Sequence, residues 1–403
     1  MPDAFQNGTI GTLHDLVDRP IDELERELTA WNAQTPIALV IPSLYSELEG
    51  PALPAILDEV ASAPYISEVV IGLDRADADQ FAAARQMIDR LPQTHRVIWQ
   101  DGPALRGIQD DLAAHGLAPL ERGKGRNVWY CLGYLLATDR ARTVALHDAD
   151  ITTYSRTMLA RLVYPVAHPD FGYEFAKGYY FRADEHRLNG RVSRLLVTPL
   201  LKALQKTLGP VDYLDFLDSF RYPLAGECSM TADVVPTIRI PSDWGMEISI
   251  LSEIYRCYPA ERVCQVDLVG PYDHKHQDLS DDDPGAGLAR MAADVALAIL
   301  GKLVTDGVVL SPARIDTIEA SYTRSAHRLI SHYANDAAFN GYQYDDAAER
   351  RAVTVFSNAL RRATHAVLDT WDDTQFTPSW ARVTSARPEA LGRLAAAVDA
   401  DNR

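Results

Sequence analysis

Apolar runs and helix-like segments alternate between residues 36 and 150, and this alternation leaves few fold classes open to the chain. Runs that suit buried strands stand at 37–43, 66–74, 95–101 and 142–150. Segments with a helical period separate them, at 50–63, 79–91 and 124–138. Strands and helices that alternate at this spacing form a mostly parallel sheet with helices on both faces. We therefore predict an α/β fold whose ligands bind beyond the carboxyl ends of the strands.

The rest of the chain is more mixed. Residues 1–34 suit a polar helical lead-in, in which Ile21, Leu24 and Leu28 share one helix face. A polar break at 276–287 precedes a strongly helical tail, so we place a boundary near 284. The predicted parts are a lead-in (1–34), a central domain (35–284, with halves 35–150 and 151–284) and a helical C-terminal region (285–403).

Charge and cysteine usage limit the partners and the compartment. The formal net charge of the 403 residues is -17, which disfavours nucleic acid and anionic membranes as partners. No stretch has the roughly 18 apolar residues that a membrane span needs, and the N-terminus does not read as a signal peptide. The four cysteines show no close pairing, which favours core thiols in a reduced, cytoplasmic setting.

Two aspartates separated by one residue, Asp148 and Asp150, end the fourth apolar run. Because side chains alternate along a strand, both carboxylates point to the same side. Carboxylate oxygens suit Mg²⁺ or Mn²⁺, and such a cation bridges the phosphates of a nucleotide sugar and stabilises a leaving diphosphate. The alternative is a turn that stops the strand and caps the next segment.

Two further motifs extend this interpretation. DHKH at 273–276 follows a strand-like run and offers His274 and His276 as imidazole ligands, with ordinary loop histidines as the alternative. GKG at 123–125 precedes a helix, so Lys124 and the backbone amides suit a phosphate or a uracil-like carbonyl. The upstream glycine of a P-loop is missing, which counts against a kinase or an ATPase.

Charged side chains at two helix starts are candidates for ligand binding. Arg191 and Arg194 share a helix face after a glycine and suit a phosphate or carboxylate, with a solvated basic face as the alternative. Glu247 lies just inside a helical run, where it suits a sugar hydroxyl or an acceptor nucleophile. It equally suits an ordinary acid that complements the helix dipole.

Taken in order, several motifs resemble the glucosyl-3-phosphoglycerate synthase family, retaining glycosyltransferases of the GT-A type. The motifs are IPSLYSE, VVIGLD, GKG, HDAD, NGRVSRLLVTPLL, PLAGE, WGMEI and DHKH. The resemblance covers residues 37–279 and implies a Rossmann-like nucleotide-sugar-binding sheet with a helical C-terminal extension.

The resemblance also implies roles for single residues. The nucleotide-sugar pocket would comprise Pro42, Ser43, Leu44, Glu47, Asp74, Lys124, Asp148, Gly226 and Glu227. The acceptor site would comprise Gly190, Arg191, Ser193 and His276. Asp150 and His274, with Asp148, would hold Mg²⁺ or Mn²⁺, and Glu247, Asp150 and Arg191 would carry the catalysis.

Three departures from the family pattern bear on these roles. Ser193 stands where the family commonly has threonine, and His276 stands where it has asparagine, so the acceptor is the ligand most in question. LYSE replaces the LNEE that commonly follows the first strand, which loosens the assignment of Glu47. The helical tail is also longer than in the shorter members.

The predicted activity is a metal-dependent transfer of glucose from a nucleotide diphosphate glucose, with UDP favoured, to the 2-hydroxyl of 3-phospho-D-glycerate. Mannose, GDP and free glycerate remain open as ligands. A non-catalytic sugar-nucleotide sensor is the alternative from another class, and the intact Asp148, Asp150 and His274 argue against it. A nucleotidyltransferase is disfavoured because no glycine-rich loop follows the first strand. The apolar stripe of the tail predicts packing on the central domain or a homodimer.

Overall fold

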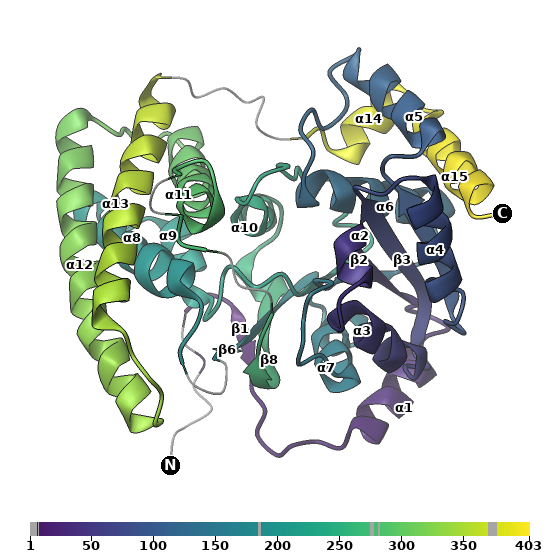
Figure 1. Ribbon diagram of the computed structural model, residues 1–403, viewed down its shortest axis with the longest axis horizontal. Helices are drawn as coiled ribbons and strands as arrows, with labels where there is room; N and C mark the ends of the chain where they lie inside the picture. Colours follow the sequence, from purple (N-terminus) through teal and green to yellow (C-terminus); the bar gives the residue numbers. More distant parts are fainter. Residues whose placement is uncertain (1–5, 7, 184–186, 275–277, 281–282, 370–376) are drawn as a thin grey trace.

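A mixed eight-stranded sheet crosses the molecule in the order β1-β8-β6-β7-β5-β2-β3-β4 (Figure 1). The computed structural model describes residues 6, 8–183, 187–274, 278–280, 283–369 and 377–403. The strands are β1 (Gly11–Leu13), β2 (Ile37–Leu44), β3 (Ile66–Asp74), β4 (Thr94–Trp99), β5 (Thr143–Leu146), β6 (Phe175–Arg182), β7 (Cys228–Thr231) and β8 (Val263–Tyr272). Among the described residues, no helix is long and apolar enough to cross a membrane.

Strands β4, β3, β2 and β5 are parallel and confirm the alternation predicted from the sequence. The helices of this half are α2 (Tyr45–Leu48), α3 (Ala52–Ala61), α4 (Ala78–Ile88), α5 (Pro103–Ala113) and α6 (Lys124–Thr138). In register, Leu44 lies beside Asp74, so β2 and β3 end at the same edge of the sheet. That edge is where the candidate ligand-binding residues were expected.

The two faces of the sheet carry separate hydrophobic cores, as the alternation along β2 illustrates. Ile37, Leu39 and Ile41 belong to one core, whereas Ala38 and Val40 belong to the other. The first core also takes residues from α1 (Ile21–Trp31), α3, α4 and α7 (Arg156–Ala167), and the second takes residues from α5 and α6. Because both faces are buried, β2 and β3 appear in the sequence as continuous apolar runs.

The other half of the sheet holds two features that the sequence did not predict. β7 runs antiparallel to both β5 and β6, while β6 and β8 are parallel. β1 pairs with β8 at the sheet edge, so the lead-in contributes a strand as well as the expected helix α1. A three-residue strand containing a glycine has no detectable period, and only its pairing partner 250 residues away defines it.

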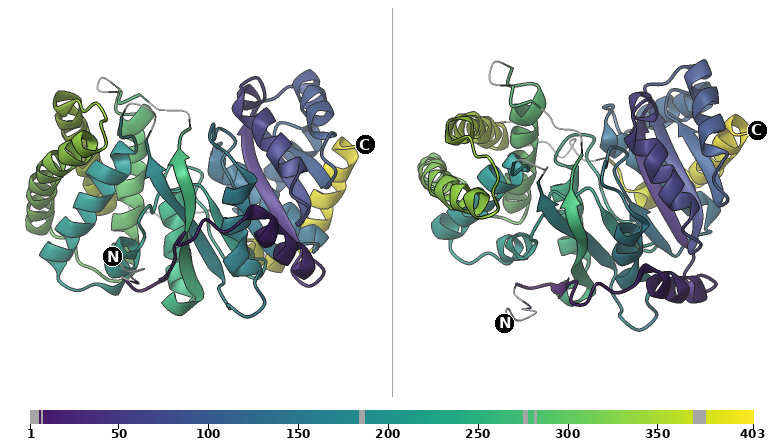
Figure 2. Two further views of the ribbon diagram at one scale, coloured as in Figure 1. Left: turned by 90° about the horizontal axis from the view of Figure 1, so that it is seen from below. Right: turned by 60° about the horizontal axis from the view of Figure 1, so that its bottom comes forward.

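Most of the remaining helices divide between the two ends of the molecule. They are α8 (Thr198–Leu208), α9 (Asp212–Ser219), α10 (Met246–Cys257), α11 (Gly287–Thr305), α12 (Pro312–Phe339), α13 (Asp346–Asp369), α14 (Trp380–Ala386) and α15 (Ala390–Asp401), with short helices η1 (Ser193–Val197) and η2 (Ala260–Arg262). α12 packs on α8, whereas α15 returns to pack on α5, α6 and β4. Figure 2 shows this separation from two further directions. The division of the chain at residue 284 stays a prediction.

All four cysteines are free thiols, and Cys131, Cys228 and Cys264 are buried. The prediction of core thiols is therefore confirmed for these three, whereas Cys257 is half-buried.

Candidate active site

A cleft of about 630 Å³ opens beyond the carboxyl ends of β2, β3 and β5. Its walls come from the loop before α6, the residues that lead into η1, the start of α10 and three side chains of α11. The predicted site residues that line it are Pro42, Ser43, Leu44, Glu47, Asp74, Lys124, Asp148, Asp150, Gly190, Arg191, Ser193, Gly226, Glu247 and His274. Two predicted residues are not among them: Glu227, and His276, which lies outside the described residues.

The centre of the cleft is an ion cluster built around Lys124. Its Nζ lies 2.6 Å from Asp148 Oδ1 and 2.9 Å from Glu247 Oε1. Burial alone lowers the pKa of Lys124, but the two carboxylates outweigh it and hold that pKa well above its usual range. Burial likewise acts to raise the pKa of Asp148, yet the ammonium group of Lys124 keeps it below its ordinary value. The ammonium and the Asp148 carboxylate therefore both stay charged.

The glycines of GKG allow this cluster to form. A Cβ on Gly125 would lie 1.8 Å from the carbonyl oxygen of Pro241, and one on Gly123 would lie 2.1 Å from that of Ser242. The loop before α10 therefore packs directly against the start of α6, which brings Glu247 to Lys124. Gly226 leaves room for the carboxylate of Asp148, because a Cβ at this position would lie 2.4 Å from Asp148 Oδ2.

Asp150 and His274 lie together at the mouth of the cleft, as expected for a metal pair. His274 Nδ1 is 3.6 Å from Asp150 Oδ2, and the neighbouring Ile151 forms a backbone bridge to His274. Asp148, the third predicted ligand, has its Oδ1 on Lys124. No group of three or more His, Cys, Asp or Glu side chains gathers as a metal site within the described part of the chain. Two protein ligands nevertheless suit a cation such as Mg²⁺, which takes the rest of its shell from phosphate oxygens and water.

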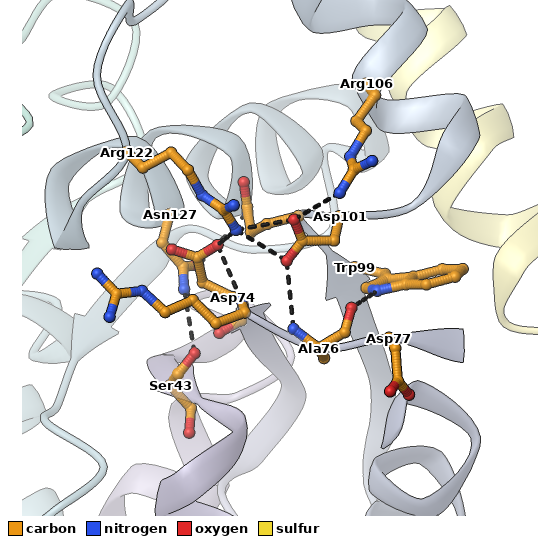
Figure 3. Close-up of polar contacts among 12 residues, drawn as sticks. Ser43, Asp74, Ala76, Asp77, Trp99, Asp101, Arg106, Arg122 and Asn127 are labelled. Atoms are coloured by element: carbon orange, nitrogen blue, oxygen red, sulfur yellow. Dashed lines mark hydrogen bonds and ion pairs between the residues drawn. The ribbon is translucent and has the colours of Figure 1, made fainter. Parts of the chain in front are cut away.

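A second ion cluster closes one end of the cleft, around Arg122 (Figure 3). Arg122 Nη2 donates to Asp74 Oδ1 at 2.5 Å and to both carboxylate oxygens of Asp101 at 2.8 Å. Arg106 donates to Asp101 from the other side at 2.9 Å. The buried Asn127 holds the ends of two strands by donating to the carbonyl oxygen of Gly72 at 2.7 Å. Sequence reasoning found Asp74 but missed these partners, since nothing local marks them.

A third ion cluster lies at the opposite end, beside the residues that lead into η1. Arg191 Nε donates to Glu349 Oε1 at 2.7 Å, and Arg194 Nη1 donates to Glu349 Oε2 at 2.9 Å. Only Arg191 of this pair lines the cleft. The prediction that both guanidinium groups face the ligand is therefore wrong for Arg194. Glu349 of α13 holds its guanidinium group, and the residue does not line the cleft.

The residues around Arg191 have irregular backbone geometry. Gly190 has φ +72°, a left-handed conformation that favours glycine, and the turns from Ser193 form a π-helix rather than the predicted α-helix. The hydroxyl of Ser193 is buried and has no hydrogen-bond partner among the described residues. A buried hydroxyl without a partner on the wall of a cleft suits a polar ligand group.

Glu227 is fully buried behind the cleft, and its neighbour Gly226 is the residue that lines the wall. Its two carboxylate oxygens accept hydrogen bonds from Tyr180 at 2.6 Å and Tyr272 at 2.8 Å. These tyrosine rings stack with centroids 3.6 Å apart. Burial raises the pKa of Glu227, and the charge of Asp148 adds to this effect. The geometry gives Glu227 a supporting place under the cleft rather than a direct one.

Comparison with known proteins yields full-length relatives. The glucosyl-3-phosphoglycerate synthase of Persephonella marina is 40% identical over 402 residues, covering 100% of this chain and 99% of that protein. The enzyme of the same name from Methanococcoides burtonii is 36% identical over 403 residues, covering 98% of each. No model of a known protein family matches the chain.

Solved structures share the fold. A crystal structure of glucosyl-3-phosphoglycerate synthase from Mycobacterium tuberculosis with Mn²⁺, UDP-glucose and phosphoglyceric acid matches with a TM-score of 0.54 at 20% identity, over 75% of this chain and 89% of that one. Mannosyl-3-phosphoglycerate synthase from Rubrobacter xylanophilus matches with a TM-score of 0.53 at 21% identity, over 72% and 86%. The predicted α/β fold of the GT-A type, with its helical C-terminal extension, is confirmed. Because the identity to the first two relatives extends over their full length, the chain belongs to the glucosyl-3-phosphoglycerate synthase family and is a glycosyltransferase.

Proposed function

We propose that this chain transfers glucose from a nucleotide diphosphate glucose, UDP-glucose in the first place, to the 2-hydroxyl of 3-phospho-D-glycerate, with Mg²⁺ or Mn²⁺ as the cation. One observation carries the proposal. A single cleft holds an end at which Asp74 and Arg122 lie side by side, a charged centre at Lys124 and an arginine end at Arg191. The names and bound ligands of the relatives agree with this arrangement.

Asp74 and Arg122 suit the base of the donor. A carboxylate accepts from the N–H of a uracil-like base, and a guanidinium beside it donates to the neighbouring carbonyl. Pro42, Ser43 and Leu44 form the wall between this end and the centre of the cleft. The ribose and the diphosphate would lie along that wall, with the diphosphate near Asp150.

Asp150 and His274 would hold the cation, with Asp148 close to them. When bound, the cation supplies positive charge to the diphosphate as it leaves. Lys124 supplies a second positive charge from the protein, and a diphosphate oxygen would take the place of one of its two carboxylate partners.

Once Lys124 turns to the phosphate, Glu247 is released to accept a hydrogen bond from a hydroxyl of the hexose. Of the two carboxylates nearest the centre, Asp148 would then stay on Lys124 and Glu247 would be held by the hexose hydroxyl, so neither is a free nucleophile. We therefore expect the acceptor hydroxyl to attack from the face on which the diphosphate leaves, with retention of configuration.

A donor and acceptor panel tests the proposal. Purified protein with Mg²⁺ or Mn²⁺ would be given UDP-glucose, GDP-glucose and GDP-mannose, each with 3-phosphoglycerate, D-glycerate or no acceptor, and release of nucleoside diphosphate followed. Release from a glucose donor only when 3-phosphoglycerate is present is the expected result. Release only with GDP-mannose or with free glycerate would replace the proposed ligands, and no release at all would favour a sugar-nucleotide sensor.

We also propose that the chain forms a homodimer, on the ground of the apolar stripe of the C-terminal helical region. Sedimentation equilibrium at micromolar concentration tests this, and a monomer there would contradict it.

A further inference from the structure

Glu349 of α13 is the buried centre of the ion cluster at the arginine end of the cleft. The residue is 3% exposed, and its two oxygens accept from Arg191 and Arg194. Glu349 itself lies 158 positions beyond Arg191 in the chain. A backbone bridge between Arg187 and Gln343 also joins the two regions. The C-terminal helices thus hold the wall of the cleft where the acceptor is expected.

The two arginines on Glu349 are not equivalent. Arg194 also donates from Nε to the carbonyl oxygen of Asn189 at 2.8 Å, and its guanidinium lies 4.7 Å from the ring centroid of Tyr333. Its side chain is 12% exposed, against 33% for that of Arg191. Arg194 is therefore a structural counter-ion, while Arg191 faces the cleft.

The contact through Nε decides which edge of Arg191 faces a ligand. Among the described residues, Glu349 takes the Nε–H, and no hydrogen bond joins Nη1 or Nη2 to a described partner. A guanidinium held in this way presents its two terminal N–H groups as a fork, which matches the two oxygens of a phosphate or carboxylate. The cluster of two arginines and one glutamate also keeps one net positive charge.

We propose that Glu349 is a positioning residue for the acceptor: it orients Arg191 so that the Nη1 and Nη2 edge binds an anionic group of the acceptor, while Arg194 neutralises the rest of its charge. This inference rests on the proposed function for the identity of the acceptor. It assigns part of acceptor recognition to the C-terminal helical region, which lies outside the sheet that carries the donor-side residues.

The direction of the effect separates positioning from simple neutralisation. If Glu349 only weakened the positive charge of Arg191, its removal would strengthen the binding of an anionic acceptor. If it positions Arg191, removal weakens binding. In Glu349→Gln, the amide NH₂ would face one of the two guanidinium donors, so one arginine would lose its acceptor and move.

The experiment compares wild type with Glu349→Gln and Glu349→Asp by steady-state kinetics and by calorimetric titration of 3-phosphoglycerate. We expect the KM and the Kd for 3-phosphoglycerate to rise about tenfold in Glu349→Gln, the loss of one charge-assisted hydrogen bond, while the KM for the glucose donor changes less than about twofold. Glu349→Asp keeps the charge and should recover part of the affinity.

Glu319 provides the matched control. It lies on the neighbouring helix α12 and pairs with Arg361 Nε at 3.3 Å, a similar ion pair that does not line the cleft. Glu319→Gln should leave both KM values unchanged. An unchanged or lower acceptor KM in Glu349→Gln, or an equal rise for donor and acceptor, would overturn the inference. If wild type itself neither binds nor uses 3-phosphoglycerate, the proposed function fails instead.

Discussion

The two ends of the cleft are built from the same ion types in different ratios. At the donor end the carboxylates of Asp74 and Asp101 are balanced by Arg122 and Arg106, whereas at the other end two arginines surround Glu349 alone. A balanced set of carboxylates and guanidinium groups suits a neutral ligand with both N–H donors and carbonyl acceptors, and an excess of guanidinium suits an anion. Local charge ratio, not net charge, therefore decides where an acidic protein of formal charge -17 takes an anionic acceptor.

The largest expected effect comes from removing Asp150, one of the two residues of the proposed metal pair between the two ends. Asp150→Ala should lower kcat by about three orders of magnitude or more, because a bound cation supplies several kcal/mol of charge stabilisation. Both ends of the cleft remain, so the Kd for 3-phosphoglycerate from calorimetry should stay within about twofold of wild type. Turnover that survives at saturating Mg²⁺ or Mn²⁺ would show that Asp150 has no metal role.

Chelation provides the matching test without a mutation. Wild-type activity should disappear in excess EDTA and return on addition of Mg²⁺ or Mn²⁺. Activity that is indifferent to chelator would remove the cation from the proposed mechanism.

Lys124→Met tests the centre of the cleft, since methionine keeps most of the length of the side chain and removes its charge. We expect kcat to fall about 10²- to 10³-fold, the usual cost of losing one preorganised donor at a developing negative charge. The substitution also leaves Asp148 and Glu247 without their shared partner. Because two unpaired carboxylates lower the melting temperature, the control is a far-UV circular dichroism spectrum at the assay temperature that matches that of wild type. A kcat within about threefold of wild type would contradict the role.

Reciprocal substitutions compare the two ends directly. Arg191→Ala should raise the acceptor KM about tenfold or more and spare the donor, whereas Arg122→Ala should raise the donor KM by a similar factor and spare the acceptor. Steady-state kinetics with each substrate varied in turn gives both values. If each variant affects both substrates equally, the division of the cleft into a donor end and an acceptor end is wrong.

The smallest expected effect concerns two neighbouring carboxylates, Asp243 and Asp294, which have fewer arginine partners than the carboxylates of the ion clusters. Burial, and next the charge of Asp294, raises the pKa of Asp243 to about 6 from an ordinary value of 3.8. Because the folded state holds this proton more tightly, the group contributes stability at low pH that is lost as pH rises from about 4 to about 6. The loss is at most about 3 kcal/mol.

Asp243→Asn removes this titration. Relative to wild type, the variant should gain unfolding free energy between pH 4 and pH 7, measured by denaturant titration at each pH. Taking the difference between the two proteins cancels the other carboxylates. A difference that does not change with pH would rule out the raised pKa.

Prediction from sequence succeeded where a local period or a short motif carries the information. The expected runs at 66–74 and 124–138 match β3 and α6 to the residue, because a buried strand and a largely buried helix each leave an apolar run, and the length of the run separates the two. The order of motifs along the chain also placed most of the site residues on one cleft. Parallel strands end at the same edge of a sheet, so residues that follow them meet.

The α/β sheet, the edge where ligands bind, the family and most of the residues along the cleft can thus be predicted from the sequence. The pairing of charges depends on the fold: Lys124 is shared by Asp148 and Glu247, Arg122 bridges Asp74 and Asp101, and Glu349 separates the roles of Arg191 and Arg194. The reason is physical. Periodicity records whether a side chain faces a core, whereas an ion pair depends on two side chains that meet across up to 158 residues of chain and leave no pattern in either segment.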